Sequence, residues 1–418
     1  MNPALTAKTV AFTACLLLLS GGRSPLGWGQ TPDFSDPLLE QIRTQSRVPA
    51  LGAARVKSTQ VESWVQGQRR FETQEQAQTQ DAFHLGSCTK AMTATLVATF
   101  VEEGRLSWQT TLSEIYPTEF STGRFQAAFA PVTLAMIGAH HSGLPGDLFQ
   151  FGDGALWLLL WGYTPTPEQP LQVHRPDEVI PIRSEFTQSI LSTPPVSPPG
   201  SRFEYSNANQ IILGAIVEKI SGKPWETLMK ERILTPLKMS SCGFGNPAAQ
   251  DLNAGDEPGT DPESARLRPP SGLWPHIWSE PKDSPESILP GIQSDNPPAL
   301  GPAGTVHCSM EDWGKFAQLH LKGAQGTDTP ILKAQSFVPL HTPYPGSDYT
   351  PGAWIRLDRD WANGAVLSHS GTNTFNYASV WIAPSIDQAF LGATNLGGDR
   401  ASEAVDAVLT VLIEKAIP

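Results

Sequence analysis

The spacing of hydrophobic and polar positions predicts strands near both ends of the chain and helices between them. A helix is expected over residues 36–48, followed by strands over 50–56 and 60–67 that should pair as a hairpin. The polar stretch 72–80 is rich in Gln and Thr and predicts a loop. The first part of the chain is therefore expected to supply one helix and two strands to a sheet.

Helical spacing is clearest in the middle of the chain. Residues 89–103 place alanine and valine at i, i+3 and i+7, and Gly104 gives a natural stop. A second helix is expected over residues 211–220, closed by Gly222. The sequence of residues 309–312, Ser-Met-Glu-Asp, is typical of an N-terminal cap and predicts a third helix.

The end of the chain returns to short strands that turn residues separate, and it closes with an amphipathic helix. The strands are expected over 353–357, 365–370, 376–382 and 390–394, and the helix over 404–416. We therefore predict an α/β fold of the α+β type, in which an antiparallel sheet flanked by terminal helices carries an inserted, mostly helical subdomain. Residues 35–86 and 345–418 are assigned to the sheet subdomain and 87–344 to the helical one.

A proline-rich segment covers residues 246–302 and holds 12 of the 38 prolines. It has little periodicity and is too long for a simple connection. An ordered lid over a cleft and a partly mobile insertion both fit this composition, and the sequence leaves the two open.

The first thirty residues are expected to be a signal peptide, which leaves a single large domain over 31–418. Lys8 precedes an apolar run over 10–19, and small residues follow that run. The run is too short for a membrane span, although an uncleaved anchor is the alternative. A lipoprotein is disfavoured because Cys15 lies inside the run. The expected location is periplasmic or secreted.

Charge and cysteine content narrow the class of protein. Residues 31–418 hold 27 basic and 41 acidic residues, a net charge of −14, which argues against nucleic acid and anionic membranes as partners. Three cysteines are too few for a disulfide framework. Cys88 is expected to be buried and inert. A Cys242–Cys308 bridge is allowed in an oxidising compartment, and two unpaired side chains are the alternative.

The first candidate for chemistry is the tetrad that runs from Ser87 to Lys90. A serine hydroxyl needs a group that takes its proton, and a lysine three residues later in the first turn of a helix lies on the same face. Helix N-termini also offer N–H groups to a developing oxyanion. Ser279 to Lys282 has the same spacing, but Pro281 stands inside it. Helical context therefore favours Ser87.

A second candidate is Tyr205-Ser206-Asn207, the only Tyr-x-Asn in the chain, just before the helix expected at 211. A phenol beside the serine can relay a proton, and an asparagine amide can hold a substrate carbonyl.

The third candidate is His369-Ser370-Gly371-Thr372-Asn373, at the end of an expected strand. A strand edge here would offer the backbone N–H of Thr372 as an oxyanion donor beside that of Ser87. Gly371 would let substrate approach the backbone closely.

In order and context these three motifs resemble the serine β-lactamase and penicillin-binding DD-peptidase superfamily, and more narrowly its class C β-lactamase-related branch, which includes esterases and D-aminopeptidases. The resemblance spans residues 35–415. Five flanking stretches are also similar to that branch: 83–86, 102–108, 141–145, 236–239 and 302–304 with Ser309 and Asp312.

The resemblance implies a role for each matching position. Ser87 is the acylated nucleophile, Lys90 and Tyr205 share the proton transfers, and Asn207 contacts substrate. His369 stands, as a substrate-binding residue, where many members have lysine. Histidine is only partly charged near neutral pH, so efficient β-lactam hydrolysis is not expected from this chain.

The expected function is hydrolysis of a small ester, amide or D-amino-acid peptide through an acyl-serine intermediate, with no cofactor. A true class C β-lactamase and a catalytically weak penicillin-binding or sensor protein are the alternatives. The adjacent His140 and His141 lack a nearby third ligand, so no metal site is expected.

Overall fold

The computed structural model describes residues 34–148, 154–162, 176–248, 272–290 and 294–417. The signal peptide expected over residues 1–30 lies outside the described residues, and so does the part of the proline-rich segment from 249 to 271. Within the described ranges, no helix has the length and apolar character needed to cross a membrane.

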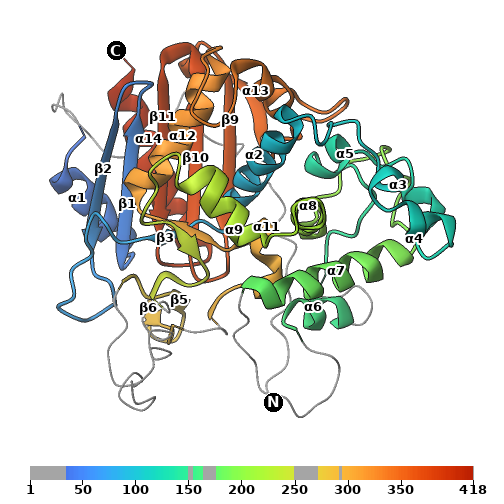
Figure 1. Ribbon diagram of the computed structural model, residues 1–418. Helices are drawn as coiled ribbons and strands as arrows, with labels where there is room; N and C mark the ends of the chain where they lie inside the picture. Colours follow the sequence, from blue (N-terminus) through green and yellow to red (C-terminus); the bar gives the residue numbers. More distant parts are fainter. Residues whose placement is uncertain (1–33, 149–153, 163–175, 249–271, 291–293, 418) are drawn as a thin grey trace. The chain divides into compact units, whose positions relative to one another are not determined.

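In the residues that the structure describes, six antiparallel strands form the main sheet (Figure 1). In spatial order they are β2 (Val61–Gly67), β1 (Ala50–Val56), β11 (Gln388–Thr394), β10 (Tyr377–Ala383), β9 (Gly364–Thr372) and β8 (Ile355–Arg359). The two strands from the start of the chain thus join the four from its end, and β1 pairs with β11 across more than 300 residues of sequence. The predicted antiparallel sheet built from both ends of the chain is confirmed.

Helices cover both faces of this sheet. Gly392 of β11 faces Val405 of α14 (Asp399–Ala416), whereas Gly52 of β1 faces Met310 of α12 (Met310–Ala324). Gly52 pairs with Ala393, the neighbour of Gly392, and successive residues of a strand point to opposite faces. The helix α1 (Asp36–Ser46) packs beside α14. The helix α12 falls in the range that we assigned to the helical subdomain, yet it packs on the sheet.

The remaining helices form the predicted helical part of the molecule (Figure 1). They are α2 (Thr89–Glu102), α3 (Leu112–Ile115), α4 (Pro117–Ser121), α5 (Leu134–Gly138), α6 (Ala155–Leu160), α7 (Pro176–Ser192), α8 (Asn207–Ser221), α9 (Trp225–Met229), α11 (Gly301–Gly304) and α13 (Ala334–His341). The central one is α2, which contacts α8, α11 and α13. Twelve of its 14 residues are buried, so this helix is surrounded by protein along its length.

Helix and strand limits follow local chemistry that the hydrophobic pattern does not contain. The helix expected from 211 begins at Asn207, because the Ser206 side chain accepts a hydrogen bond from the Ala208 backbone N–H. It ends, as expected, at Gly222, whose φ is 72°. The third motif lies at the end of β9, as expected, and this strand continues two residues beyond the predicted limit, to Thr372.

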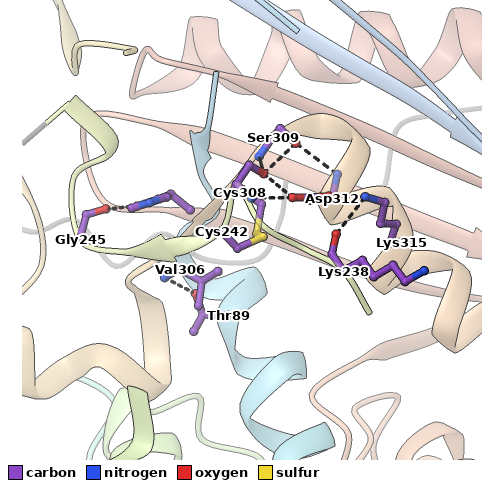
Figure 2. Close-up of a disulfide and its surroundings, with 11 residues drawn as sticks. Thr89, Lys238, Cys242, Gly245, Val306, Cys308, Ser309, Asp312 and Lys315 are labelled. Atoms are coloured by element: carbon purple, nitrogen blue, oxygen red, sulfur yellow. Dashed lines mark hydrogen bonds and ion pairs between the residues drawn. A yellow bond between two sulfur atoms is a disulfide. The ribbon is translucent and has the colours of Figure 1, made fainter. Parts of the chain in front are cut away.

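A small second sheet supports the segment that precedes Ser87. Its order is β3 (Phe83–His84), β7 (Val306–Cys308) and β4 (Gly243–Phe244). Cys242, next to β4, is disulfide-bonded to Cys308 of β7, so the alternative of two unpaired cysteines is wrong (Figure 2). Phe83 pairs with Cys308 in the sheet. The disulfide therefore anchors β7, the strand that pairs with β3, and β3 leads directly to the turn that carries Ser87.

Candidate active site

The three motifs of the sequence meet where η1, a single 3₁₀ turn (Gly86–Cys88), leads directly into α2. Ser87 is half-buried in this turn. The Lys90 Nζ lies 2.9 Å from the Ser87 Oγ and is hydrogen-bonded to it. The first turn of the helix thus brings the two side chains of the tetrad into contact, as their spacing predicted.

Lys90 is fully buried, and its second hydrogen bond goes to the carbonyl oxygen of Ala303, 2.7 Å from Nζ. Burial disfavours the charged amine and lowers the pKa of Lys90 to about 7. Near neutral pH a large fraction of this lysine therefore carries a free lone pair. Such an amine, held against a hydroxyl, can accept the hydroxyl proton as the oxygen attacks.

Cys88 stands between the two residues in sequence but takes no part in this contact. It is buried, and its Sγ lies 3.6 Å from the carbonyl oxygen of His369. Burial raises the pKa of the Cys88 thiol, which therefore stays protonated and is a poor nucleophile.

Tyr205 completes the cluster from the segment before α8. The Lys90 Nζ lies 5.0 Å from the centre of the Tyr205 ring. Burial raises the pKa of the phenol, and a hydrogen bond with the Ser87 side chain opposes this only in part. The phenol thus stays protonated at neutral pH and can donate a proton. Asn207, the first residue of α8, is half-buried two positions further on.

Two glycines let the first and third motifs approach backbone to backbone. A Cβ atom on Gly371 would lie 2.5 Å from the Ser87 backbone nitrogen, and one on Gly86 would lie 2.4 Å from that of Thr372. Gly86 also has a φ of +50°, which favours glycine. The amides of Ser87 and Thr372 are therefore close together, as an oxyanion hole requires. The neighbouring Ser370 donates a hydrogen bond to Ser379 Oγ at 3.0 Å.

His369 differs from our expectation of a partly charged group that faces substrate. It is fully buried, and its Nδ1 lies 2.7 Å from the carbonyl oxygen of Ser370. A carbonyl only accepts, so Nδ1 carries the proton and Nε2 accepts from the Tyr349 hydroxyl at 2.9 Å. Burial, reinforced by Lys90, lowers the pKa of His369 to about 3. The side chain is therefore neutral and has no surface left for substrate.

Sequence reasoning missed two rings that pack around Tyr205. The ring centre of His140 lies 4.4 Å from that of Tyr205 and 4.9 Å from that of Tyr349. The Nδ1 of His140 accepts from the Ser206 backbone N–H at 3.1 Å and lies 2.9 Å from Asn209 Nδ2. We had weighed His140 only as a metal ligand. The sequence offers one sign that His140 lies near the active site: it directly precedes residues 141–145, one of the stretches that resemble the family.

Among the described residues, no three or more His, Cys, Asp or Glu side chains are grouped so that they could hold a metal ion. The side-chain groups that the structure brings together around Ser87 are its own hydroxyl, the Lys90 amine and the Tyr205 phenol.

Comparisons with known proteins agree with this geometry. Residues 36–415 match the family model described as Beta-lactamase. Penicillin-binding protein 4 of Amycolatopsis lactamdurans is 24% identical over 391 residues, covering 90% of this chain and 88% of its own. Unguisins hydrolase ungD' of Aspergillus campestris is 23% identical, covering 78% of this chain and 55% of its own. Among solved structures, that of SurE aligns with a TM-score of 0.67 at 20% identity, over 91% of this chain and 75% of its own.

The chain therefore belongs to the beta-lactamase family, and it is a serine hydrolase of that family. The resemblance predicted from the three motifs is confirmed. The fold is the one that class C β-lactamases and penicillin-binding proteins share.

Proposed function

We propose that this protein is a secreted hydrolase that cleaves a small ester or amide, including D-amino-acid peptides, through an acyl intermediate on Ser87. The observation that carries the proposal is the contact of 2.9 Å between Lys90 Nζ and Ser87 Oγ, together with a Lys90 pKa of about 7. A buried neutral amine beside a half-buried hydroxyl is what formation of an acyl-serine requires.

The pKa values divide the proton transfers between Lys90 and Tyr205. Lys90, with a pKa near 7, takes the Ser87 proton as the oxygen attacks the substrate carbonyl. Tyr205 is protonated at neutral pH; it passes its proton to the leaving group and takes in return the proton that Lys90 gained. Water then attacks the acyl group, with Lys90 as the base, and its addition frees the Ser87 hydroxyl and the acid product. The backbone amides of Ser87 and Thr372 hold the oxyanion. Asn207 holds a second substrate carbonyl, and substrate lies along the strand from Ser370 to Thr372.

The neutral His369 supports esters, amides and peptides over β-lactams. A β-lactam carries a carboxylate, and a fixed positive charge at position 369 would hold it, whereas a histidine with a pKa of about 3 has no charge to offer. The name of one relative, the D-alanyl-D-alanine-carboxypeptidase/endopeptidase AmpH of Escherichia coli, which is 26% identical over 38% of this chain, supports a D-amino-acid peptide as substrate. The disulfide between Cys242 and Cys308 supports folding in an oxidising compartment outside the cytosol.

Turnover of three chromogenic substrates tests this proposal: a p-nitrophenyl ester, a D-alanine p-nitroanilide and a chromogenic cephalosporin. We expect turnover of the ester or the anilide, slow or no turnover of the cephalosporin, and a loss of about a thousandfold or more in Ser87→Ala. Ser279→Ala is the matched control, because it alters the other Ser-x-x-Lys sequence and should leave turnover unchanged. Equal turnover by Ser87→Ala would contradict the assignment, and fast cephalosporin turnover would favour a β-lactamase.

A further inference from the structure

Asp295 lies in the proline-rich segment. One of its side-chain oxygen atoms contacts side chains from both segments that carry the proposed oxyanion-hole amides. Its side chain is 5% exposed. The Oδ1 lies 2.9 Å from His84 Nε2 and accepts hydrogen bonds from Asn373 Nδ2 at 2.9 Å and from the Asn296 backbone N–H at 2.7 Å. His84 lies three residues before Ser87, and Asn373 directly follows Thr372. A single carboxylate oxygen thus joins the two sides of the site.

The first connection leads through His84 to the turn that carries Ser87. The side chain of His84 is fully buried, and its Nδ1 accepts from the Gly86 backbone N–H at 3.1 Å. Because Nδ1 accepts, the ring proton of neutral His84 is on Nε2, the atom nearest Asp295. This contact does not have hydrogen-bond geometry, and Nε2 has no hydrogen-bond partner among the described residues. Asp295 therefore lies in contact with the ring whose Nδ1 holds the Gly86 amide, one residue before Ser87.

The second connection leads through Asn373 to the end of β9. While Asn373 Nδ2 donates to Asp295, its Oδ1 accepts from the Phe375 backbone N–H at 3.3 Å and from Asn376 Nδ2 at 3.0 Å. Asn373 is 5% exposed. These bonds hold the turn that follows Thr372, and with it the direction of the Thr372 amide.

We propose that Asp295 is a positioning residue that keeps the Ser87 and Thr372 amides in register through His84 and Asn373. This inference rests on the proposed function, because both amides act there on the oxyanion. Asp295 contributes to the site through geometry and not through its charge, because a negative charge close to the developing oxyanion would destabilise that oxyanion. All three contacts of Asp295 Oδ1 are with donors, and Oδ2 bonds to none of the described residues. An amide oxygen can therefore replace the carboxylate.

Paired substitutions test this proposal with the p-nitrophenyl ester. Asp295→Ala should lower kcat about 10- to 100-fold with KM within about threefold, because a misaligned oxyanion hole weakens transition-state contacts and leaves substrate binding intact. Asp295→Asn should restore kcat to within about threefold of the unaltered protein. Asp283→Ala is the control, because Asp283 lies in the same segment but is exposed and paired with Arg47 at the surface.

The results separate this inference from the proposed function. An unaltered protein that is inactive, or whose activity does not depend on Ser87, would contradict the proposed function. If Ser87 is required but Asp295→Ala keeps its kcat, or Asp295→Asn loses as much as Asp295→Ala, the positioning role is wrong. Should Asp295→Ala fail to fold, Asn373→Ala cuts the second connection alone. A fall in its kcat at unchanged KM supports the proposal, and an unchanged kcat overturns it.

Discussion

Replacing Lys90 with methionine is expected to lower kcat/KM for an ester by about a thousandfold or more, because it removes the group that takes the Ser87 proton. Methionine suits this position, since the lysine side chain is fully buried and methionine has a similar length without the amine. The fold should therefore survive, as near-ultraviolet circular dichroism would show. Retention of activity by a folded Lys90→Met protein would contradict the assignment of the base.

The pH profile of the unaltered protein provides a second measurement on the same lysine. Burial lowers the pKa of Lys90 to about 7, so the amine is charged and inactive below that pH and neutral and active above it. A plot of kcat/KM against pH should therefore rise through about pH 7 and level off on the alkaline side. A profile that stays flat from pH 5 to 9 would contradict a base of this pKa.

Removing the Cys242–Cys308 disulfide is expected to lower the free energy of unfolding by about 4 kcal/mol, because the bond closes a loop over a sequence separation of 66 residues. The double variant Cys242→Ala/Cys308→Ala should unfold at a lower urea concentration than the oxidised protein. Addition of a reductant should lower the midpoint of the unaltered protein toward that of the variant.

The same double variant supplies the control for this result. The buried Cys88 remains in it, so a reductant should not shift its midpoint further. Equal midpoints for the double variant and the oxidised protein would show that the disulfide contributes nothing to stability. A shift that the reductant causes in the double variant would place the redox effect elsewhere in the chain.

The parts of the fold that the sequence predicted well are those in which the information is local. The strand expected over residues 50–56 is β1 with the same limits, because seven consecutive side chains specify it. The small sheet of β3, β7 and β4 was missed, since its strands are two or three residues long and carry no periodicity. The pairing of β3 with β7 joins residues more than 200 positions apart, as Phe83 and Cys308 show.

The active site divides in the same way. Ser87 and Lys90 are three residues apart, so helix geometry alone predicted their contact. Tyr349 was missed because its hydrogen bond to His369 depends on how the chain before β8 folds back. The motif showed that a histidine stands at position 369. Its neutral state depends on its burial in the folded protein, which a sequence motif does not show.

The sequence does not distinguish a lid from a mobile insertion for the proline-rich segment, and the parts of it that the structure describes are hydrogen-bonded to neighbouring segments. The Trp274 backbone N–H donates to the carbonyl oxygen of Arg69, and Asn296 Nδ2 donates to that of Gly304 at 2.8 Å. Asp295 was not identified from the sequence, because an aspartate among many prolines has no distinguishing pattern. Only its partners on β3 and after β9 make it a candidate.

The most direct test of the central claim is the mass of the protein trapped during reaction. Mixed with benzylpenicillin or an activated ester and quenched with acid, it should gain the mass of one acyl group. Digestion should place that group on the peptide that contains Ser87, and Ser87→Ala should gain no mass. An acyl group on any other residue, or the same gain in Ser87→Ala, would contradict an acyl intermediate on Ser87.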